Sequence, residues 1–222
     1  LVEVQTDDGI TGWGECFGPG NIALANKFIV EKVIQPLIIG EDPFNKEHIW
    51  HKVYNLLRDS GQKGMPIQAL SGVDIALWDI VAKFSNLPLY SILGSSGGKK
   101  MPAYASLWRY EDVDSVQDRC QRAKNIGYKH VKLHEIYTPE VEVARNTLGD
   151  DISIMVDTNC PWTKDKARQM LNSWEEFDLY WVEEPINPPE DFESLSNLRS
   201  ESLIPIAAGE NACTSFEFKK MF

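Results

Sequence analysis

The 222-residue sequence has the composition of an ordinary globular protein, with 43% hydrophobic and 25% charged residues. Its formal net charge of −11 argues against nucleic acid or an anionic membrane as a partner, because both need a basic surface. No apolar stretch approaches the roughly 20 residues that span a bilayer, and the N-terminus lacks a signal-peptide pattern, so we expect a cytoplasmic protein. The four cysteines lack the spacing of a zinc site or a disulfide framework, so we expect free thiols.

The first part of the chain has the pattern of a β-hairpin followed by helices. Residues 1–5 alternate apolar and polar side chains, Asp8-Gly9 marks a turn, and residues 10–15 form the second strand. Because the chain begins inside a strand, without Met, we expect its natural start to lie further upstream. Helical periodicity then covers residues 22–38, 43–58 and 65–85.

Strands and helices alternate after a glycine-rich segment, residues 93–98, that is typical of a linker. Such alternation predicts a parallel sheet with helical crossovers. The expected strands lie near residues 101–107, 129–134, 152–157, 179–183 and 204–208. The expected helices between them lie near residues 112–126, 139–148, 163–176 and 190–199.

Five strands of this kind are compatible with a doubly wound sheet or with part of a TIM-type (β/α) barrel. The uniform strand–helix period and the acids on successive strands favour the barrel. About three βα units would then have to follow Phe222, so we interpret the sequence as truncated at both ends. We therefore expect an α/β protein, with an α+β domain over residues 1–97 and the first five βα units of a barrel over residues 98–222.

Three carboxylates, Asp157, Glu183 and Glu210, end successive apolar strand-like segments at nearly equal intervals. In a parallel barrel, consecutive strand ends lie side by side on one rim, so these acids should converge. Converging carboxylates repel one another unless a cation neutralises them, and a site made only of oxygen ligands suits Mg²⁺. The sequence therefore predicts a magnesium enzyme with these three residues as ligands.

The preceding strand carries two candidate catalytic residues, Lys132 and His134, on one face. Beside a cation, the pKa of either side chain would be lowered, which would make a neutral base available near pH 7. The alternative is a barrel-interior lysine that only pairs with one of the acids.

Two further polar residues lie next to the predicted ligands. Asn159 should point the same way as Asp157 and is a candidate to bind a substrate hydroxyl or carboxylate, although asparagine is also a common turn former. Glu184 directly follows Glu183, so we expect it to point elsewhere and to hold Lys132.

Six motifs, in order, resemble the mandelate racemase/muconate lactonising group of the enolase superfamily. The resemblance implies an α+β capping domain over a modified (β/α) barrel, with Mg²⁺ held by Asp157, Glu183 and Glu210. It also implies abstraction of the proton α to a substrate carboxylate, through an ene-diolate that the cation stabilises. The motifs are Gly12-Trp-Gly-Glu15, Ala69-Leu-Ser-Gly-Val-Asp-Ile-Ala-Leu-Trp-Asp79, Val131-Lys-Leu-His134, Val156-Asp-Thr-Asn159, Val182-Glu-Glu-Pro185 and Ala208-Gly-Glu-Asn211.

One position departs from the pattern of that group, which commonly has Lys-x-Lys on the second barrel strand where this chain has Lys132 and His134. The resemblance then implies that His134 is the base, or an acid toward a leaving hydroxyl, and that Lys132 is its electrostatic partner. A base on the opposite face of the substrate would lie beyond Phe222. Assemblies are common in the group, so a homo-oligomer is compatible by analogy.

The candidate site residues predict abstraction of the α-proton, but they do not determine which product forms. We expect a Mg²⁺-dependent enzyme for a hydroxy or sugar acid that acts by dehydration or by racemisation/epimerisation, with a lactonising cycloisomerase as the alternative. Another alternative is a barrel glycoside hydrolase, which would use two carboxylates and no metal. The third acid and Lys132 argue against it, because that mechanism requires neither. A third alternative is a noncatalytic or incomplete barrel that binds a cation for stability only.

Overall fold

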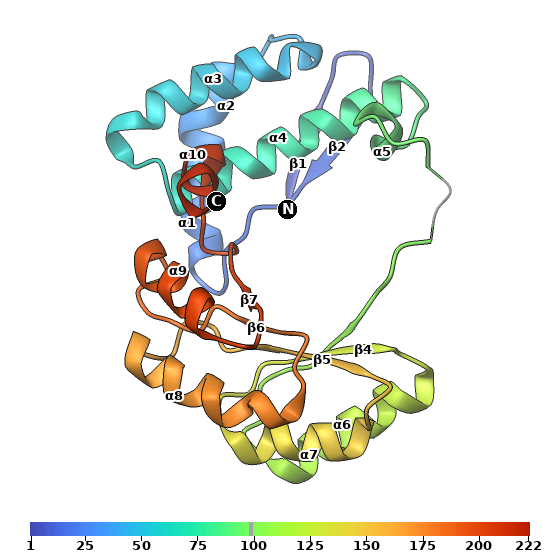
Figure 1. The fold of residues 1–222 in the computed structure, drawn as a ribbon. Coiled ribbons are helices and arrows are strands. Elements are labelled where there is room, and N and C mark those ends of the chain that lie inside the picture. The colour runs from blue at the N-terminus through green and yellow to red at the C-terminus, as the bar shows by residue number, and fades with distance from the viewer. Residues whose placement is uncertain (98–99) are drawn as a thin grey trace. The chain divides into compact units, whose positions relative to one another are not determined.

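The computed structural model describes residues 1–97 and 100–222, which form two compact units, Leu1–Lys99 and Lys100–Phe222 (Figure 1). Each unit has its own hydrophobic core, as expected of a domain. We predicted a domain boundary between residues 97 and 98 and a linker that ends at Gly98. Gly98 lies outside the described residues.

Unit 1 contains a two-stranded antiparallel sheet and a group of helices. Strands β1 (Val2–Gln5) and β2 (Thr11–Gly14) pair antiparallel, which confirms the predicted hairpin. Gly9, in the turn between them, has a φ of +83°, a conformation that glycine adopts without a steric cost. The helices are α1 (Ile22–Phe28), π-helix η1 (Ile29–Ile34), α2 (Gln35–Ile38), 3₁₀-helix η2 (Pro43–Asn45), α3 (Lys46–Leu57), 3₁₀-helix η3 (Arg58–Ser60), α4 (Met65–Phe84) and α5 (Leu89–Ile92).

The helix predicted over residues 22–38 is present, but η1 interrupts it. The N–H of Gln35 donates to the carbonyl of Val30, five residues earlier, instead of four. Pro36 follows directly and has no N–H to continue the regular α-helical ladder, which accounts for the position of the break.

Helix α4 is the core helix of unit 1. Its most apolar stretch of 18 residues has a mean hydropathy of 1.3, enough to cross a membrane by length and composition, which corrects the expectation that no apolar stretch approaches that length. However, 56% of this stretch is buried inside the protein, and Leu70, Val73 and Leu77 belong to the core of the unit. The apolar character of α4 is therefore explained by packing.

Strand β2 lies unusually close to α4 because both carry glycine at the contact. A Cβ atom at Gly14 would lie 1.9 Å from the carbonyl oxygen of Gly72, and one at Gly12 would lie 2.1 Å from that of Ala76. Real Cβ atoms do not approach other atoms so closely, so any side chain at either strand position would push the sheet off the helix.

Asp79, a charged residue of α4, also holds β2 against this helix. The Asp79 carboxylate accepts hydrogen bonds from the Trp13 N–H at 2.8 Å and from the Lys83 ammonium at 2.7 Å. Lys83 also donates to the Thr11 carbonyl at 2.8 Å. Burial alone would raise the pKa of Asp79, but these hydrogen bonds and the charge of Lys83 outweigh it and lower the pKa below its ordinary value.

Unit 2 is a five-stranded sheet with the order β3-β4-β5-β6-β7, in which every neighbouring pair is parallel. This confirms the α/β class and the sequential strands expected at the start of a barrel. The strands are β3 (Ala105–Ser106), β4 (His130–Leu133), β5 (Ser153–Asp157), β6 (Trp181–Glu183) and β7 (Ile206–Ala207). The helices are α6 (Val113–Ile126), α7 (Thr138–Leu148), α8 (Lys164–Trp174), 3₁₀-helix η4 (Glu175–Phe177), α9 (Phe192–Glu201) and α10 (Thr214–Met221).

The two faces of this sheet differ in chemistry. Val131, Ile154 and Val182 belong to the large apolar core that also includes side chains of the crossover helices. Side chains alternate along a strand, so the residues between them, such as Lys132 and Asp157, lie on the opposite face. The polar site of unit 2 is therefore built on the sheet face that the helices do not cover.

We predict that Gly14→Ala destabilises unit 1 by about 1–3 kcal/mol, because the new methyl group would meet backbone atoms that cannot rotate away. Urea unfolding followed by circular dichroism would measure the change. Gly40→Ala is the control: Gly40 has a φ of +81° and no atom within 4 Å of the position that a Cβ would take, so only backbone strain of about 1–2 kcal/mol would appear. A smaller loss at Gly14 than at Gly40 would contradict the close-packing account.

We predict that Asp79→Asn lowers the free energy of unfolding by about 1 kcal/mol at neutral pH. A hydrogen-bonded charge contributes more when it is buried, but Asp79 is partly exposed, so solvent screening reduces its contribution. Because the folded-state pKa of Asp79 is lowered, its stabilisation exists above the unfolded pKa of about 3.9 and is lost as pH falls through the folded value. The difference between variant and parent should therefore disappear in acid. Asp59→Asn, at a side chain that is 86% exposed, should change little at any pH.

Candidate active site

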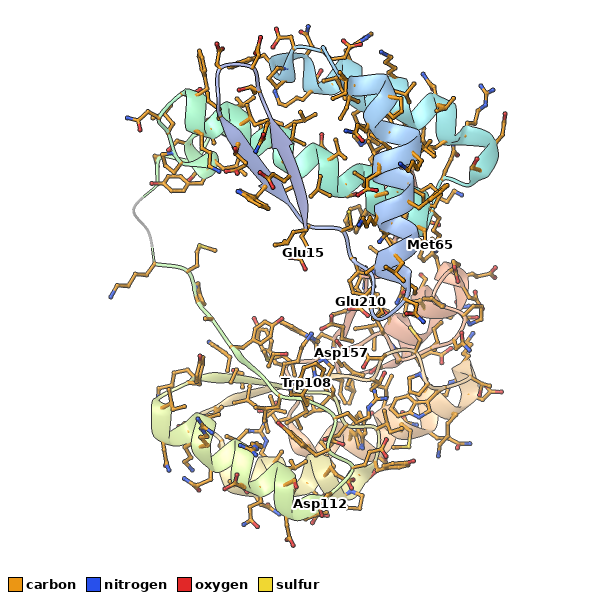
Figure 2. All side chains as sticks on the ribbon, turned by 180° about the vertical axis from the view of Figure 1, so that it is seen from behind. Glu15, Met65, Trp108, Asp112, Asp157 and Glu210 are labelled. Carbon is orange, nitrogen blue, oxygen red and sulfur yellow. The ribbon has the colours of Figure 1, made fainter. Side chains whose placement is uncertain are left out.

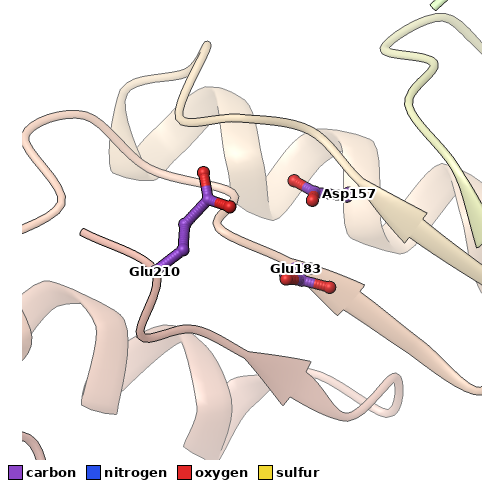
Figure 3. Close-up of side chains that lie close together, drawn as sticks. All are labelled: Asp157, Glu183 and Glu210. Carbon is purple, nitrogen blue, oxygen red and sulfur yellow. The ribbon is translucent and has the colours of Figure 1, made fainter. Parts of the chain in front are cut away.

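Three carboxylates meet where β5, β6 and β7 end. Asp157 and Glu183 are the last residues of β5 and β6 and lie directly opposite each other in the parallel ladder. Glu210 follows β7 on the loop that leads to α10, and Figure 2 shows it near Asp157. One oxygen of each of the three side chains lies within 4.8 Å of the others (Figure 3). The structure therefore brings together the three residues predicted as metal ligands.

The charge in this carboxylate cluster is only partly compensated. Asp157 is buried, Glu183 is half-buried and Glu210 is exposed. Although Glu210 is exposed as a residue, partial desolvation of its carboxylate raises its pKa, and the charges of Glu184, Asp157 and Glu183 raise it further. Negative charge left uncompensated at Glu210 gives the cluster the electrostatic character of a cation site, and its donors are all carboxylate oxygens, which suit Mg²⁺.

Lys132 lies between two of the acids. Its ammonium nitrogen is 3.0 Å from Asp157 Oδ2 and 3.3 Å from Glu183 Oε2, and the residue is only 8% exposed. Burial alone would lower the pKa of Lys132, but the hydrogen bonds and charges of both acids outweigh it and raise the pKa. The pairing foreseen as a structural alternative is therefore present, with two acids instead of one.

His134 contacts the same carboxylate and a backbone carbonyl. Its Nε2 lies 3.5 Å from Asp157 Oδ2, and its Nδ1 contacts the carbonyl oxygen of Leu107. Since a carbonyl can only accept, Nδ1 carries a proton, and Nε2 is the nitrogen that can exchange one. The hydrogen bond with Asp157 raises the pKa of His134 more than burial lowers it. The lowering of this pKa that we expect beside a bound cation stays a prediction.

Asn159 has the geometry of a turn residue that supports Asp157. Its φ is +55°, and both its backbone N–H and its side-chain amide donate to Asp157 Oδ1, at 3.1 and 3.0 Å. Its side-chain oxygen accepts from Arg109 at 3.1 Å. These contacts favour the structural alternative, and the substrate-binding role of Asn159 stays a prediction.

The expectation that Glu184 holds Lys132 is wrong. Glu184 has a φ of +50°, so the chain leaves the extended conformation immediately after β6. Its carboxylate is turned to the loop after β7, where it accepts from the Gly209 N–H at 3.3 Å and from the Asn211 side chain. Strand alternation cannot predict a side-chain direction at a residue that has left the strand.

Two residues that the sequence analysis missed support the site. Arg109 donates to the carbonyls of His134 and Thr158, at 2.5 and 2.8 Å, and so ties the loops after β4 and β5 together. Trp181 donates its indole N–H to Glu183 Oε2 at 3.2 Å. Its position two residues before Glu183 could have indicated this contact, because residues two apart in a strand share a face.

Two further tryptophans are core residues, and the cysteines agree with the sequence analysis. Trp162 and Trp174 are 7% and 0% exposed and pack edge to face in the core of unit 2. In the described part of the chain all four cysteines are free thiols.

We predict that Arg109→Ala lowers the free energy of unfolding of unit 2 by about 2 kcal/mol, because two backbone carbonyls lose a charged donor. Thermal unfolding would measure the loss. Arg119→Ala is the matched control, since that side chain is 44% exposed and pairs only with its neighbour Asp118 in the described residues. Equal losses in the two variants would contradict a supporting role for Arg109.

Comparison with known proteins identifies the family. The family model for the N-terminal domain of mandelate racemase/muconate lactonizing enzymes matches residues 1–94, and the enolase C-terminal domain-like family model matches residues 115–222. A racemase from Streptomyces coelicolor A3(2), solved with bound magnesium, has a TM-score of 0.91 and 30% identity, over 99% of this chain and 67% of that one. The chain belongs to the mandelate racemase/muconate lactonising group of the enolase superfamily.

Curated relatives in this superfamily include different activities. D-galactarolactone cycloisomerase of Agrobacterium fabrum is 35% identical over 219 residues, which are 95% of this chain and 57% of that protein. Arabinonate dehydratase of Saccharolobus solfataricus is 33% identical over 226 residues, 97% of this chain and 60% of that protein. The chain thus spans about three fifths of these relatives. Membership of the superfamily confirms the resemblance seen in the six motifs and leaves the glycoside hydrolase alternative without support.

Proposed function

We propose that this chain belongs to an enzyme that uses Mg²⁺ to abstract the α-proton of a hydroxy or sugar acid, with dehydration or racemisation/epimerisation as the outcome. The observation that carries this proposal is the meeting of three carboxylates at successive strand ends beside Lys132 and His134. The names of the relatives support it, because they include sugar-acid dehydratases and a racemase.

Asp157, Glu183 and Glu210 would hold the metal. Three carboxylates are a suitable protein contribution to a Mg²⁺ site, which keeps its other positions for water and substrate oxygens. Bound there, Mg²⁺ would supply positive charge that attracts the substrate carboxylate and stabilises the charge that develops as the α-proton leaves.

Lys132 would supply a second positive charge to the substrate carboxylate. Its ammonium group is already held in place by Asp157 and Glu183, so little side-chain entropy remains to be lost when the substrate binds. An ammonium group paired with two carboxylates suits charge stabilisation better than proton abstraction.

His134 would move the proton. The contact of Nδ1 with the Leu107 carbonyl fixes the orientation of the ring, and Nε2 is then the atom that accepts the α-proton. Once protonated, the same nitrogen can donate to a departing β-hydroxyl, which would complete a dehydration. The relation to a D-galactarolactone cycloisomerase favours ring opening or closing as the second candidate outcome.

The proposal is tested by exchange of the α-proton with deuterium in D₂O, using the full-length protein and a set of hydroxy and sugar acids. We expect exchange with Mg²⁺ and none with EDTA. His134→Asn should reduce the rate by roughly 10²–10⁴-fold, the usual contribution of a general base. His130→Asn, a change at the other end of the same strand, should keep both the rate and the metal dependence.

The other outcomes identify what is wrong. Exchange that persists with EDTA would contradict the magnesium mechanism, and full exchange in His134→Asn would place the base elsewhere. Tight Mg²⁺ binding without exchange of any acid would favour the alternative in which the cation only stabilises the fold.

A further inference from the structure

Glu210 differs from the other two members of the carboxylate cluster in how it is held. Asp157 and Glu183 are strand residues, and the ladder between β5 and β6 fixes their backbones. Strand β7 ends at Ala207, and Glu210 lies in a turn beyond it, closed by the hydrogen bond from the Ala212 N–H to the Gly209 carbonyl at 3.0 Å. The sheet therefore does not determine where the Glu210 carboxylate lies.

The carboxylate of Glu184 holds the chain on both sides of Glu210. Its Oε1 accepts from the Gly209 N–H at 3.3 Å, and its Oε2 accepts from the side-chain amide of Asn211. We propose that Glu184 is a positioning residue that fixes Glu210 in the metal-binding arrangement. This inference rests on the proposed function, in which Glu210 is a metal ligand.

Glu184 is itself firmly anchored. Its backbone N–H donates to the Ala207 carbonyl at 2.9 Å, and its carbonyl accepts from the Cys160 N–H at 2.7 Å and the Thr158 hydroxyl at 2.9 Å. Glu184 is 4% exposed and therefore has little freedom to reorient. It connects the end of β5, the end of β6 and the loop after β7.

The thiol of Cys160 completes the set of donors to Glu184. Its Sγ lies 3.0 Å from Glu184 Oε2. Burial raises the pKa of Cys160 to about 12, with further contributions from the hydrogen bond to Glu184 and from nearby carboxylates, so the thiol is protonated and can donate. Glu184 is thus a buried carboxylate with three protein donors, which satisfies its charge without Lys132.

Glu184 also contributes negative charge close to the cluster, so two explanations of any effect on metal binding must be separated. Glu184→Gln removes the charge and one of the acceptors together. Asn211→Ala leaves the charge in place and removes only the donor beside Glu210. Asn211 is exposed, so its variant should fold even where Glu184→Gln does not.

The test is the dissociation constant of Mg²⁺, measured by titration calorimetry on the full-length protein at a temperature where circular dichroism shows each variant folded. Residues that orient metal ligands commonly contribute 10–100-fold to affinity, and we expect a loss in that range for Glu184→Gln. Asn211→Ala should weaken binding by about tenfold. The double variant should bind no more weakly than Glu184→Gln alone, because both changes break one network.

Two reference variants and a control complete the design. Asp157→Asn and Glu210→Gln should each weaken Mg²⁺ binding at least as much as Glu184→Gln. Glu140→Gln removes another buried carboxylate, 7% exposed and located in the first turn of α7, whose Oε2 has no hydrogen-bond partner among the described residues. Its Mg²⁺ affinity should equal that of the parent.

Unchanged affinity in both Glu184→Gln and Asn211→Ala, with loss in Glu210→Gln, would overturn this inference and leave the metal site intact. Loss in Glu184→Gln with parental affinity in Asn211→Ala would also overturn it, because the effect would then come from charge alone. Parental affinity in both Asp157→Asn and Glu210→Gln would instead refute the proposed function.

Discussion

Repulsion among the carboxylates at the ends of β5, β6 and β7 is the constraint on which the local structure of unit 2 depends. The parallel register places Asp157 directly opposite Glu183, and the loop after β7 adds Glu210. Lys132 is buried between the first two and compensates part of their charge. Such an arrangement gains little for folding, since a buried ion pair barely offsets its own desolvation. Under the proposed function, its value lies in binding a cation and a substrate carboxylate.

The backbone around this cluster is correspondingly unusual. Asn159, Cys160 and Glu184 all have positive φ although none is glycine, and all three lie just beyond the ends of β5 and β6. Conformations of this kind cost of order 1–3 kcal/mol each and persist where surrounding contacts enforce them. Here Arg109 and the donors to Glu184 provide those contacts. The strained residues turn the chain so that support for the acids comes from several loops.

Unit 1 depends on close backbone packing between β2 and α4. The glycines of the Gly12-Trp-Gly-Glu15 motif let β2 approach α4, and Asp79 and Lys83 bind the strand at its edge. Two of the motifs that carry the family resemblance therefore have a structural explanation that does not require a catalytic role. The other four motifs lie in unit 2, and each contributes at least one residue to the carboxylate cluster or to its contacts.

The sequence alone determined the order of the elements and the meeting of Asp157, Glu183 and Glu210, because hydrophobic periodicity and the geometry of parallel strands act over single segments. It also determined that Lys132 and His134 share a face. Tertiary structure decided which partners these side chains take: Lys132 contacts two acids, Glu184 turns to the Glu210 loop, and Arg109 joins two loops. The physical reason is that alternation ends with the strand. Beyond it, positive φ and contacts between loops distant in sequence set each direction.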